Sequence, residues 1–279
     1  MKYSRKPIFN KLIVELHSNC NRNCHFCNRQ GDDSGMRLDR EGNRIIKAMP
    51  TENVLNILDQ AAAMGFRGLV GLHQWSEPFL DRRIIEIAEE ARKRGMRPYA
   101  HTNGDVLRNN AALAKKTAEV FEYLVVGLYD YKNEVELAAE KEFWRSRLQG
   151  TGVSFSESGH VRSNVFAPFD GVNAPIKMLY PHGPCLEPSE RLIIHYDGNV
   201  SLCCEDMKAE FSLGNAFDTP IRDIWYSPQY RRIVKNLKKG FRQKYPLCAV
   251  CPVPPPENRT VFNRIVSRVK REAAAAGLL

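Results

Sequence analysis

No stretch of this 279-residue chain is apolar over the length that a membrane span needs. The N-terminal sequence MKYSRKPIFNKLIVELHS also lacks the apolar run of a signal peptide. Long internal repeats and low-complexity regions are absent, and the 43% hydrophobic and 26% charged residues are ordinary for a folded soluble protein. The sequence therefore predicts a cytoplasmic protein with no membrane partner.

Acidic residues are scarce in the last fifth of the chain. Residues 222–279 contain 13 Lys and Arg but only three Asp and Glu, so the rest of the chain is close to neutral although the net charge is +9. The basic segment is either a solvated helical face or a surface for an anionic partner, such as an acidic peptide, a phosphorylated small molecule or a nucleic acid.

Eight cysteines stand out against this background, because disulfides are rare in the cytosol and cysteines there point to metal binding or catalysis. Cys20, Cys24 and Cys27 follow the spacing C-x3-C-x2-C. Three thiolates are one too few for a closed zinc site, but they can hold three irons of a cubane cluster and leave the fourth iron open. A partial zinc site and a chance spacing are the alternatives.

The first 150 residues alternate between strand and helix patterns. Repeated β-then-α units with short connections predict an α/β fold with a parallel sheet, open or closed into a barrel, whose chemistry lies at the carboxyl ends of the strands. Strands are expected over 11–16, 68–72, 97–102 and 123–129, and helices over 52–64, 81–94, 109–119 and 133–148.

The pattern changes near residue 150. Gly, Ser and Pro become frequent over 150–184, which indicates a last core strand and an irregular linker. RLIIHY (191–196) and NVSLCC (199–204) flank Asp197-Gly198 and predict a β-hairpin.

A basic helix is expected to begin at Ser227-Pro228 and to end at Gly240. The proline-rich segment 246–256 is expected to be neither helix nor central strand. Apolar residues at helical spacing near the C-terminus predict a docking helix.

The first cysteine cluster resembles the signature of the radical S-adenosylmethionine (SAM) superfamily. Cys20, Cys24 and Cys27 match it, together with the aromatic Phe26 directly before the last cysteine. The resemblance implies a partial (β/α)6 barrel and a [4Fe–4S] cluster whose open iron binds SAM. Reduction would cleave SAM to a 5′-deoxyadenosyl radical that abstracts a hydrogen atom from the substrate.

Two weaker motifs agree with this family. Ser76, Glu77 and Pro78 resemble the Gly-Glu-Pro element that receives the SAM amino group, although Ser replaces Gly. Thr102 and Asn103 precede Gly104 and resemble the Thr-Asn-Gly near the SAM ribose and methionine, although Asn-Gly is also an ordinary turn.

Five further cysteines lie in the second half of the chain. Cys248 and Cys251 form a C-x2-C pair, and Cys203 and Cys204 are neighbours on an expected strand, where they would face opposite sides. From the residues alone, a structural zinc site remains possible.

The second half as a whole resembles the twitch/SPASM extension of radical SAM enzymes. The resemblance implies an auxiliary [4Fe–4S] cluster held by Cys185, Cys203, Cys248 and Cys251, whose offsets are similar to those of aminocyclitol dehydrogenases and sugar epimerases of aminoglycoside biosynthesis. The expected domains are a radical SAM core over 1–175, a small twitch domain of hairpin and helix over 176–258, and a basic C-terminal helix over 259–279.

A small-molecule substrate is favoured over a peptide, with an electron donor such as flavodoxin or ferredoxin. The outcome is two-electron oxidation or epimerisation, and Cys204 is either a buried small residue or a hydrogen donor to a substrate radical. Four residues near the strand ends either line the substrate pocket or pack: His73, Trp75, His101 and Tyr129. A peptide-modifying enzyme and a non-catalytic iron–sulfur or zinc protein that binds nucleic acid are the alternatives.

Overall fold

The computed structural model describes residues 8–24, 27, 41, 43, 46–129, 133–156, 179–251 and 253–256. These residues build one seven-stranded sheet in the order β5-β4-β3-β2-β1-β6-β7. Its strands are β1 (Lys11–Val14), β2 (Leu69–Gly71), β3 (Arg97–Thr102), β4 (Tyr123–Gly127), β5 (Gly152–Ser156), β6 (Arg191–Ile194) and β7 (Val200–Ser201).

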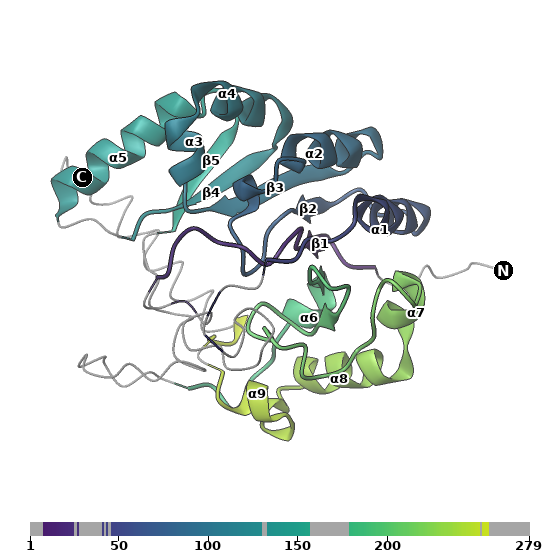
Figure 1. The fold of residues 1–279 in the computed structure, drawn as a ribbon. Coiled ribbons are helices and arrows are strands. Elements are labelled where there is room, and N and C mark those ends of the chain that lie inside the picture. Colours follow the sequence, from purple (N-terminus) through teal and green to yellow (C-terminus); the bar gives the residue numbers. More distant parts are fainter. Residues whose placement is uncertain are drawn as a thin grey trace.

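Helices connect the strands and extend beyond them (Figure 1). The first half contains α1 (Thr51–Ala63), the 3-10 turn η1 (Pro78–Leu80), α2 (Ile84–Lys93), α3 (Asp105–Asn109), α4 (Ala111–Val120) and α5 (Glu134–Arg147). The second half contains α6 (Glu187–Glu190), α7 (Ile221–Tyr226), α8 (Pro228–Lys238), the 3-10 turn η2 (Arg242–Lys244) and α9 (Pro246–Ala249).

The sheet confirms the predicted α/β class with a parallel, partly closed arrangement. Strands β1 to β5 pair in parallel, each following a β/α connection, as right-handed crossovers require. The sixth parallel strand, β6, belongs to the predicted hairpin: it pairs with β1, and β7 returns antiparallel to it. The hairpin therefore extends the core sheet. The division at residues 175 and 258 stays a prediction, and the predicted C-terminal helix lies outside the described residues.

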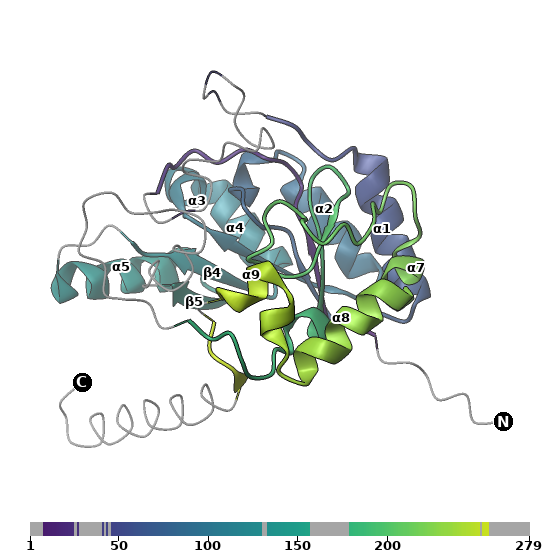
Figure 2. The same ribbon diagram turned by 90° about the horizontal axis from the view of Figure 1, so that it is seen from below.

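Alternating side chains give the sheet two different faces. One face, with Leu12, Val70 and Leu124, packs on the helices in the main hydrophobic core. The opposite face carries a small cluster of Ile13, Tyr99 and Ile193. Figure 1 shows α1, α2 and α4 beside the sheet, and Figure 2 shows α7 and α8 continuing past α1. The face opposite the helices is the inner face of the partial barrel.

Three local predictions differ from the structure. The helix expected over 109–119 is α4, which begins at Ala111, because Asn110 is extended and its side-chain oxygen caps α4 by accepting a hydrogen bond from the Leu113 amide. The short helix α3, which ends at Asn109, was not predicted. The strand expected over 199–204 ends at Ser201, where the Asp206 carboxylate accepts the amide hydrogen bond of Leu202 that a longer ladder would use.

The third difference is α9, which lies in the segment 246–256 that was expected to be non-helical. Pro246 occupies the first helical position, where its missing N–H leaves no bond unmade. Among the described residues, no helix is both long and apolar enough to cross a membrane.

Candidate functional site

The loop after β1 that carries the first three cysteines is tied to the ends of β2 and β3. The Glu77 amide donates a hydrogen bond to the Asn19 carbonyl at 2.9 Å. The Asn103 side-chain amide donates to Asn21 Oδ1 at 2.8 Å and lies 3.9 Å from the Cys20 sulfur. The structure therefore brings Cys20, Glu77 and Asn103 together, as the carboxyl ends of neighbouring parallel strands require.

An ion pair holds the same loop from the other side. Arg22 makes two hydrogen bonds with the Asp105 carboxylate, at 2.8 Å from Nε and 2.5 Å from Nη2. The hydrogen bond and positive charge of Arg22 lower the pKa of Asp105, which begins α3. Sequence patterns do not reveal this pair, because the two residues are 83 positions apart and belong to no motif.

The Cys27 amide donates a hydrogen bond to the Cys24 carbonyl at 2.9 Å. All three cysteines of the loop are reduced and partly exposed. Phe26, the predicted aromatic of the signature, lies outside the described residues. The three thiols thus lie at the edge of the sheet, where a ligand can reach them.

Glu77 is a buried structural carboxylate, only 2% exposed. Its Oε1 accepts from the Thr102 hydroxyl at 2.7 Å and the Phe79 amide at 3.2 Å, and its Oε2 accepts from the Asn103 amide at 2.7 Å. Ser76 precedes it and is partly exposed, and Pro78 begins η1. The carboxylate therefore joins the two predicted SAM-contact motifs to each other through hydrogen bonds.

Burial raises the pKa of Glu77 from 4.5 to about 7, against the opposing effect of its hydrogen bonds. Because the folded pKa lies above the unfolded one, the stability from this group is complete below pH 4.5 and is lost as the pH rises to about 7. Glu77→Gln removes the titrating carboxyl group. It also places the Gln side-chain NH2 opposite a group that donated a hydrogen bond to the carboxylate. We expect the variant to unfold at a lower temperature than wild type, with a larger gap at pH 5.5 than at pH 8.

The measurement is the thermal unfolding midpoint of anaerobic holoenzyme at both pH values. Glu119→Gln, at an exposed glutamate of α4, is the matched control and should show no such dependence. If the difference in unfolding midpoint between wild type and Glu77→Gln is the same at both pH values, the assigned titration of Glu77 is wrong.

A second buried pair joins the core to the hairpin. Glu15 and His195 are both fully buried at the ends of β1 and β6, with 3.0 Å between Glu15 Oε2 and His195 Nδ1. Glu15 Oε1 also accepts from the Trp75 amide at 2.8 Å. The pair fixes the β2 end and the hairpin relative to β1. No sequence motif marks it, since the pairing of β6 with β1 was not foreseen.

Rings from β3, β4 and the β2 end form a row on the inner face of the barrel. The His73 and His101 rings stack with centroids 4.3 Å apart, Tyr99 meets His73 edge-on at 5.0 Å, and Tyr99 stacks on Tyr123 at 4.8 Å. Cys204 packs against the Ile13, Tyr99 and Ile193 cluster on this face. The inner face therefore offers imidazole and phenol groups within reach of the cysteine loop's edge of the sheet.

The other four cysteines of the second half come from three separate chain segments. Cys185 precedes α6, Cys203 follows β7, Cys248 lies in α9 and Cys251 follows it. Cys185 and Cys248 contact the main hydrophobic core. The Cys185 amide donates to the Leu237 carbonyl, and the Tyr180 amide donates to the Cys251 carbonyl, both at 2.9 Å. Three chain segments are thus held around one region.

These thiols interact electrostatically, as a shared ligand set should. Burial, and then the neighbouring Cys185 and Cys251, raise the pKa of Cys248 to about 12. Burial raises the pKa of Cys203 well above its usual value, and the proximity of Cys204, Glu205 and then Cys248 adds to the shift. Such thiols are neutral unless a bound metal compensates their charge.

The donor set fits a cluster of several metal ions. A zinc ion needs every sulfur at about 2.3 Å, whereas a cubane gives each thiolate its own iron. Four cysteine donors fit this ligation of a [4Fe–4S] cluster.

Two family matches cover the two cysteine sets. Residues 14–150 match the Radical SAM superfamily, and residues 185–252 match SPASM, described as an iron-sulfur cluster-binding domain. The chain is a radical SAM enzyme with a SPASM domain. SAM and a [4Fe–4S] cluster belong to the first domain and auxiliary iron–sulfur chemistry to the second, which confirms the predicted cofactors.

Individual proteins are similar over most of the chain. The S-adenosyl-L-methionine-dependent 2-deoxy-scyllo-inosamine dehydrogenase of Niallia circulans is 26% identical over 258 residues, covering 88% of this chain and 93% of that protein. The crystal structure of BtrN in complex with AdoMet and 2-DOIA has a TM-score of 0.67 at 21% identity, covering 88% of this chain and 94% of that one.

A structure with a lower TM-score has a similar fold. Native anSMEcpe with bound AdoMet and Kp18Cys peptide has a TM-score of 0.55 at 12% identity, covering 87% of this chain and 88% of that one. The fold therefore occurs with different bound molecules, 2-DOIA in one structure and a peptide in the other, and the fold alone does not identify a substrate.

Proposed function

We propose that this radical SAM enzyme oxidises an alcohol carbon of a small polyhydroxylated molecule, of the aminocyclitol class, in the cytoplasm. The observation that carries the proposal is the similarity to the 2-deoxy-scyllo-inosamine dehydrogenase, which spans 93% of that protein and includes both cysteine regions of this chain. The higher TM-score to BtrN than to the peptide-bound structure supports a small molecule over a peptide.

The residues have separate tasks in this proposal. Cys20, Cys24 and Cys27 hold the first cluster, Asn103 and the backbone around Glu77 position SAM, and the four cysteines Cys185, Cys203, Cys248 and Cys251 hold the auxiliary cluster. When bound, the first cluster and SAM supply a hydrogen-atom acceptor, and the auxiliary cluster supplies a one-electron acceptor. A flavodoxin or ferredoxin would supply the starting electron.

The row of His73, His101 and Tyr99 recognises the substrate's hydroxyl and amino groups. Imidazole and phenol groups both donate and accept hydrogen bonds, which suits a ring with many such groups. The inner face also excludes water next to an apolar floor of Ile13 and Ile193, and this protects a reactive intermediate.

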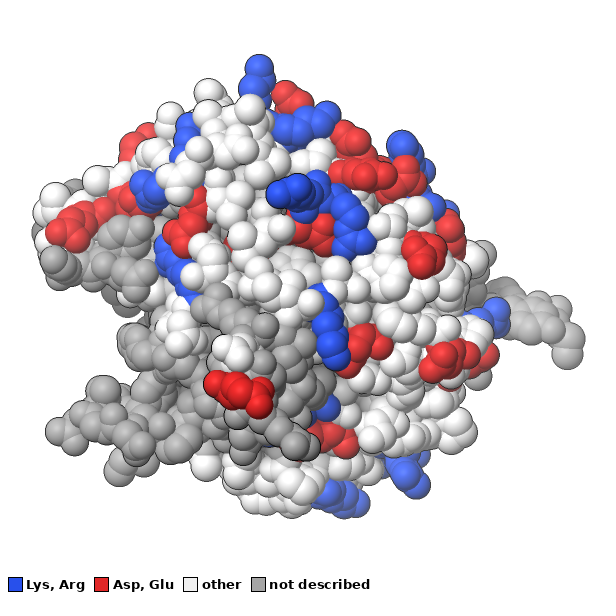
Figure 3. Space-filling model, in the orientation of Figure 1, with Lys and Arg blue, Asp and Glu red and all other residues white. Residues whose placement is uncertain are grey.

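The nucleic-acid alternative gains no support from the visible surface. On the face shown in Figure 3, Lys and Arg are interspersed with Asp and Glu, and the described residues form no continuous basic surface there. A groove that binds nucleic acid concentrates positive charge along its length.

The test is to incubate anaerobically reconstituted enzyme with dithionite, SAM and 2-deoxy-scyllo-inosamine. We expect 5′-deoxyadenosine and a product two mass units lighter than the substrate, in equal amounts. Formation of 5′-deoxyadenosine that neither depends on the aminocyclitol nor yields an oxidised product would refute the substrate class.

Epimerisation is a second candidate because of one observation, the place of Cys204 on the inner face against Ile13 and Tyr99. There its thiol faces the same side of the sheet as the ring row. An epimerase returns a hydrogen atom to the substrate radical, and an S–H group exchanges with solvent.

A reaction in heavy water distinguishes oxidation from epimerisation. If the enzyme is a dehydrogenase, Cys204→Ala keeps oxidation within about twofold of wild type, because a partly buried cysteine contributes mainly packing. If the enzyme is an epimerase, the wild-type product contains deuterium from the solvent at a C–H position, and the product of Cys204→Ala does not. Mass spectrometry of the recovered sugar separates these results.

A further inference from the structure

Arg242 is a buried cation at the auxiliary cysteine site. The residue is only 2% exposed, although it begins a short turn between the exposed residues Phe241 and Gln243. Burying a guanidinium is costly unless hydrogen bonds and an opposite charge compensate it. The surroundings of Arg242 therefore show what it is paired with.

Its hydrogen bonds go to the two segments that flank Cys185 and Cys251. Nη1 donates to the Val253 carbonyl at 2.6 Å and to the Tyr180 carbonyl at 3.4 Å, and Nη2 donates to the Pro184 carbonyl at 3.0 Å. Pro184 directly precedes Cys185, and Val253 follows Cys251 by two positions. The guanidinium thus joins the segments that carry two of the four thiols.

Among the residues that the structure describes, no carboxylate forms a hydrogen bond or an ion pair with Arg242. The hydrogen-bond acceptors around Arg242 are neutral carbonyls, and its buried Nε has no hydrogen-bond partner there. The segments that Arg242 joins carry Cys185 and Cys251, so thiolates at these two positions can compensate its charge.

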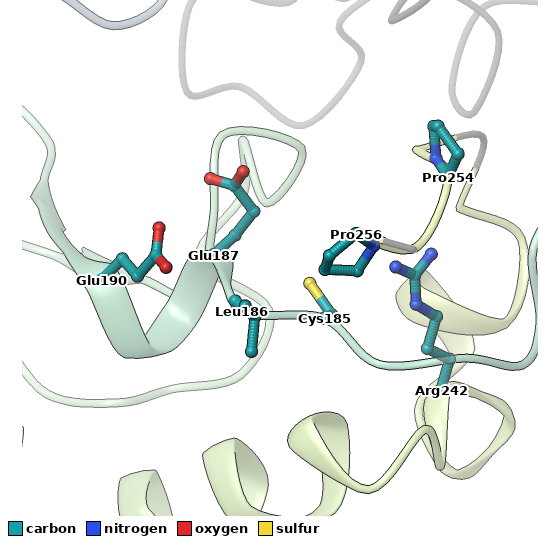
Figure 4. A pocket seen from close by; sticks show the side chains of 7 residues that line it. All are labelled: Cys185, Leu186, Glu187, Glu190, Arg242, Pro254 and Pro256. Carbon is teal, nitrogen blue, oxygen red and sulfur yellow. The ribbon is translucent and has the colours of Figure 1, made fainter. Parts of the chain in front are cut away.

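A cavity beside Arg242 also places it next to a cysteine of the auxiliary site. Arg242 and Cys185 line one cavity of about 170 Å³, between α6 and the segment of Pro254 and Pro256 (Figure 4). Two glutamates also line it, but Glu187 pairs with Arg191 at 2.5 Å and Glu190 is exposed to solvent. Of the charged residues that line the cavity, Arg242 is the one that is buried.

We propose that Arg242 is a positioning residue that raises the reduction potential of the auxiliary cluster, by placing a buried positive charge beside its thiolates. This rests on the proposed assignment of the cluster to Cys185, Cys203, Cys248 and Cys251. An iron–sulfur cluster gains a negative charge on reduction, so a neighbouring cation stabilises the reduced form, and the net charge and hydrogen bonds around the sulfurs set the potential. Arg242 thereby makes the cluster a better acceptor for the substrate's electron.

The test uses full-length protein in which Cys20, Cys24 and Cys27 are alanine, so that only the auxiliary cluster contributes to the signal. Iron content is counted first, and a titration with reductant is followed by electron paramagnetic resonance. We expect Arg242→Gln to make reduction about tenfold less favourable, a shift of about 59 mV to lower potential for one electron. Arg242→Lys keeps the charge and should keep most of the potential.

Lys244→Gln is the matched control, since it removes an exposed cation from the same turn and should shift the reduction equilibrium less than twofold. Full iron with an unchanged potential in Arg242→Gln overturns the role of Arg242 and leaves the cluster assignment standing. Loss of iron from both Arg242→Gln and Arg242→Lys also overturns it, because Arg242 would then only clamp the chain. Loss of iron from Arg242→Gln alone supports the charge role. A parent variant without iron overturns the cluster assignment, and the proposal falls with it.

Discussion

Replacing Cys20, Cys24 and Cys27 together by alanine should reduce the iron content from about eight to about four atoms per chain and abolish SAM cleavage. The three thiols are the only ligands that the first half of the chain offers to a cluster by sequence, and the loop that carries them is tied to Glu77 and Asn103. Without the cluster, no group in this loop can pass an electron to SAM. Iron analysis and chromatography of 5′-deoxyadenosine after dithionite addition measure both effects.

The control for this variant is Cys204→Ala, which removes a cysteine that is outside both predicted ligand sets. It should keep all the iron and the SAM cleavage of wild type. A triple variant that still cleaves SAM at the wild-type rate would show that the open-iron cluster is held elsewhere.

Replacing Cys248 and Cys251 by alanine should separate SAM cleavage from oxidation of the substrate. The variant should lose about four irons, keep SAM cleavage, and lose the oxidised product. The physical reason is that the remaining Cys185 and Cys203 offer two thiolates, too few to hold a cubane. Because Cys248 lies in the hydrophobic core, the variant's far-ultraviolet circular dichroism should be compared with that of wild type.

The double variant Cys248→Ser with Cys251→Ser controls for lost packing, since serine nearly preserves the volume of the cysteine side chain. Both double variants should lose the product to the same degree. Oxidation of the substrate at the wild-type rate in a correctly folded double variant would show that the auxiliary cluster is not the electron acceptor.

The sequence predicts those features of the fold that depend on local pattern or on fixed spacing. Buried strands followed by amphipathic helices are sufficient for the parallel order from β1 to β5. The same rule predicts that the cysteine loop, Glu77 and Asn103 share one edge of the sheet, and their hydrogen bonds confirm this. The first cysteine set is predicted from the C-x3-C-x2-C spacing and the second from the resemblance to the twitch/SPASM extension, and the ligand roles of both sets stay a prediction.

What the sequence does not predict depends on contacts between distant residues. The pairing of β6 with β1 joins segments 180 positions apart, and the buried Glu15–His195 pair depends on it. Arg242 is one of 13 basic residues in its region, and only the fold distinguishes it from the exposed ones. The break at Asn110 and the short helix α9 depend on single capping and first-turn positions, which periodicity does not resolve.

Transfer of a substrate hydrogen atom to SAM-derived 5′-deoxyadenosine tests the central claim most directly. The proposed aminocyclitol, deuterated at every ring carbon, is incubated with reconstituted enzyme, dithionite and unlabelled SAM, and the nucleoside is analysed by mass spectrometry. The account predicts one deuterium in the 5′-deoxyadenosine for each molecule of oxidised product. Unlabelled 5′-deoxyadenosine beside an unchanged aminocyclitol would contradict it.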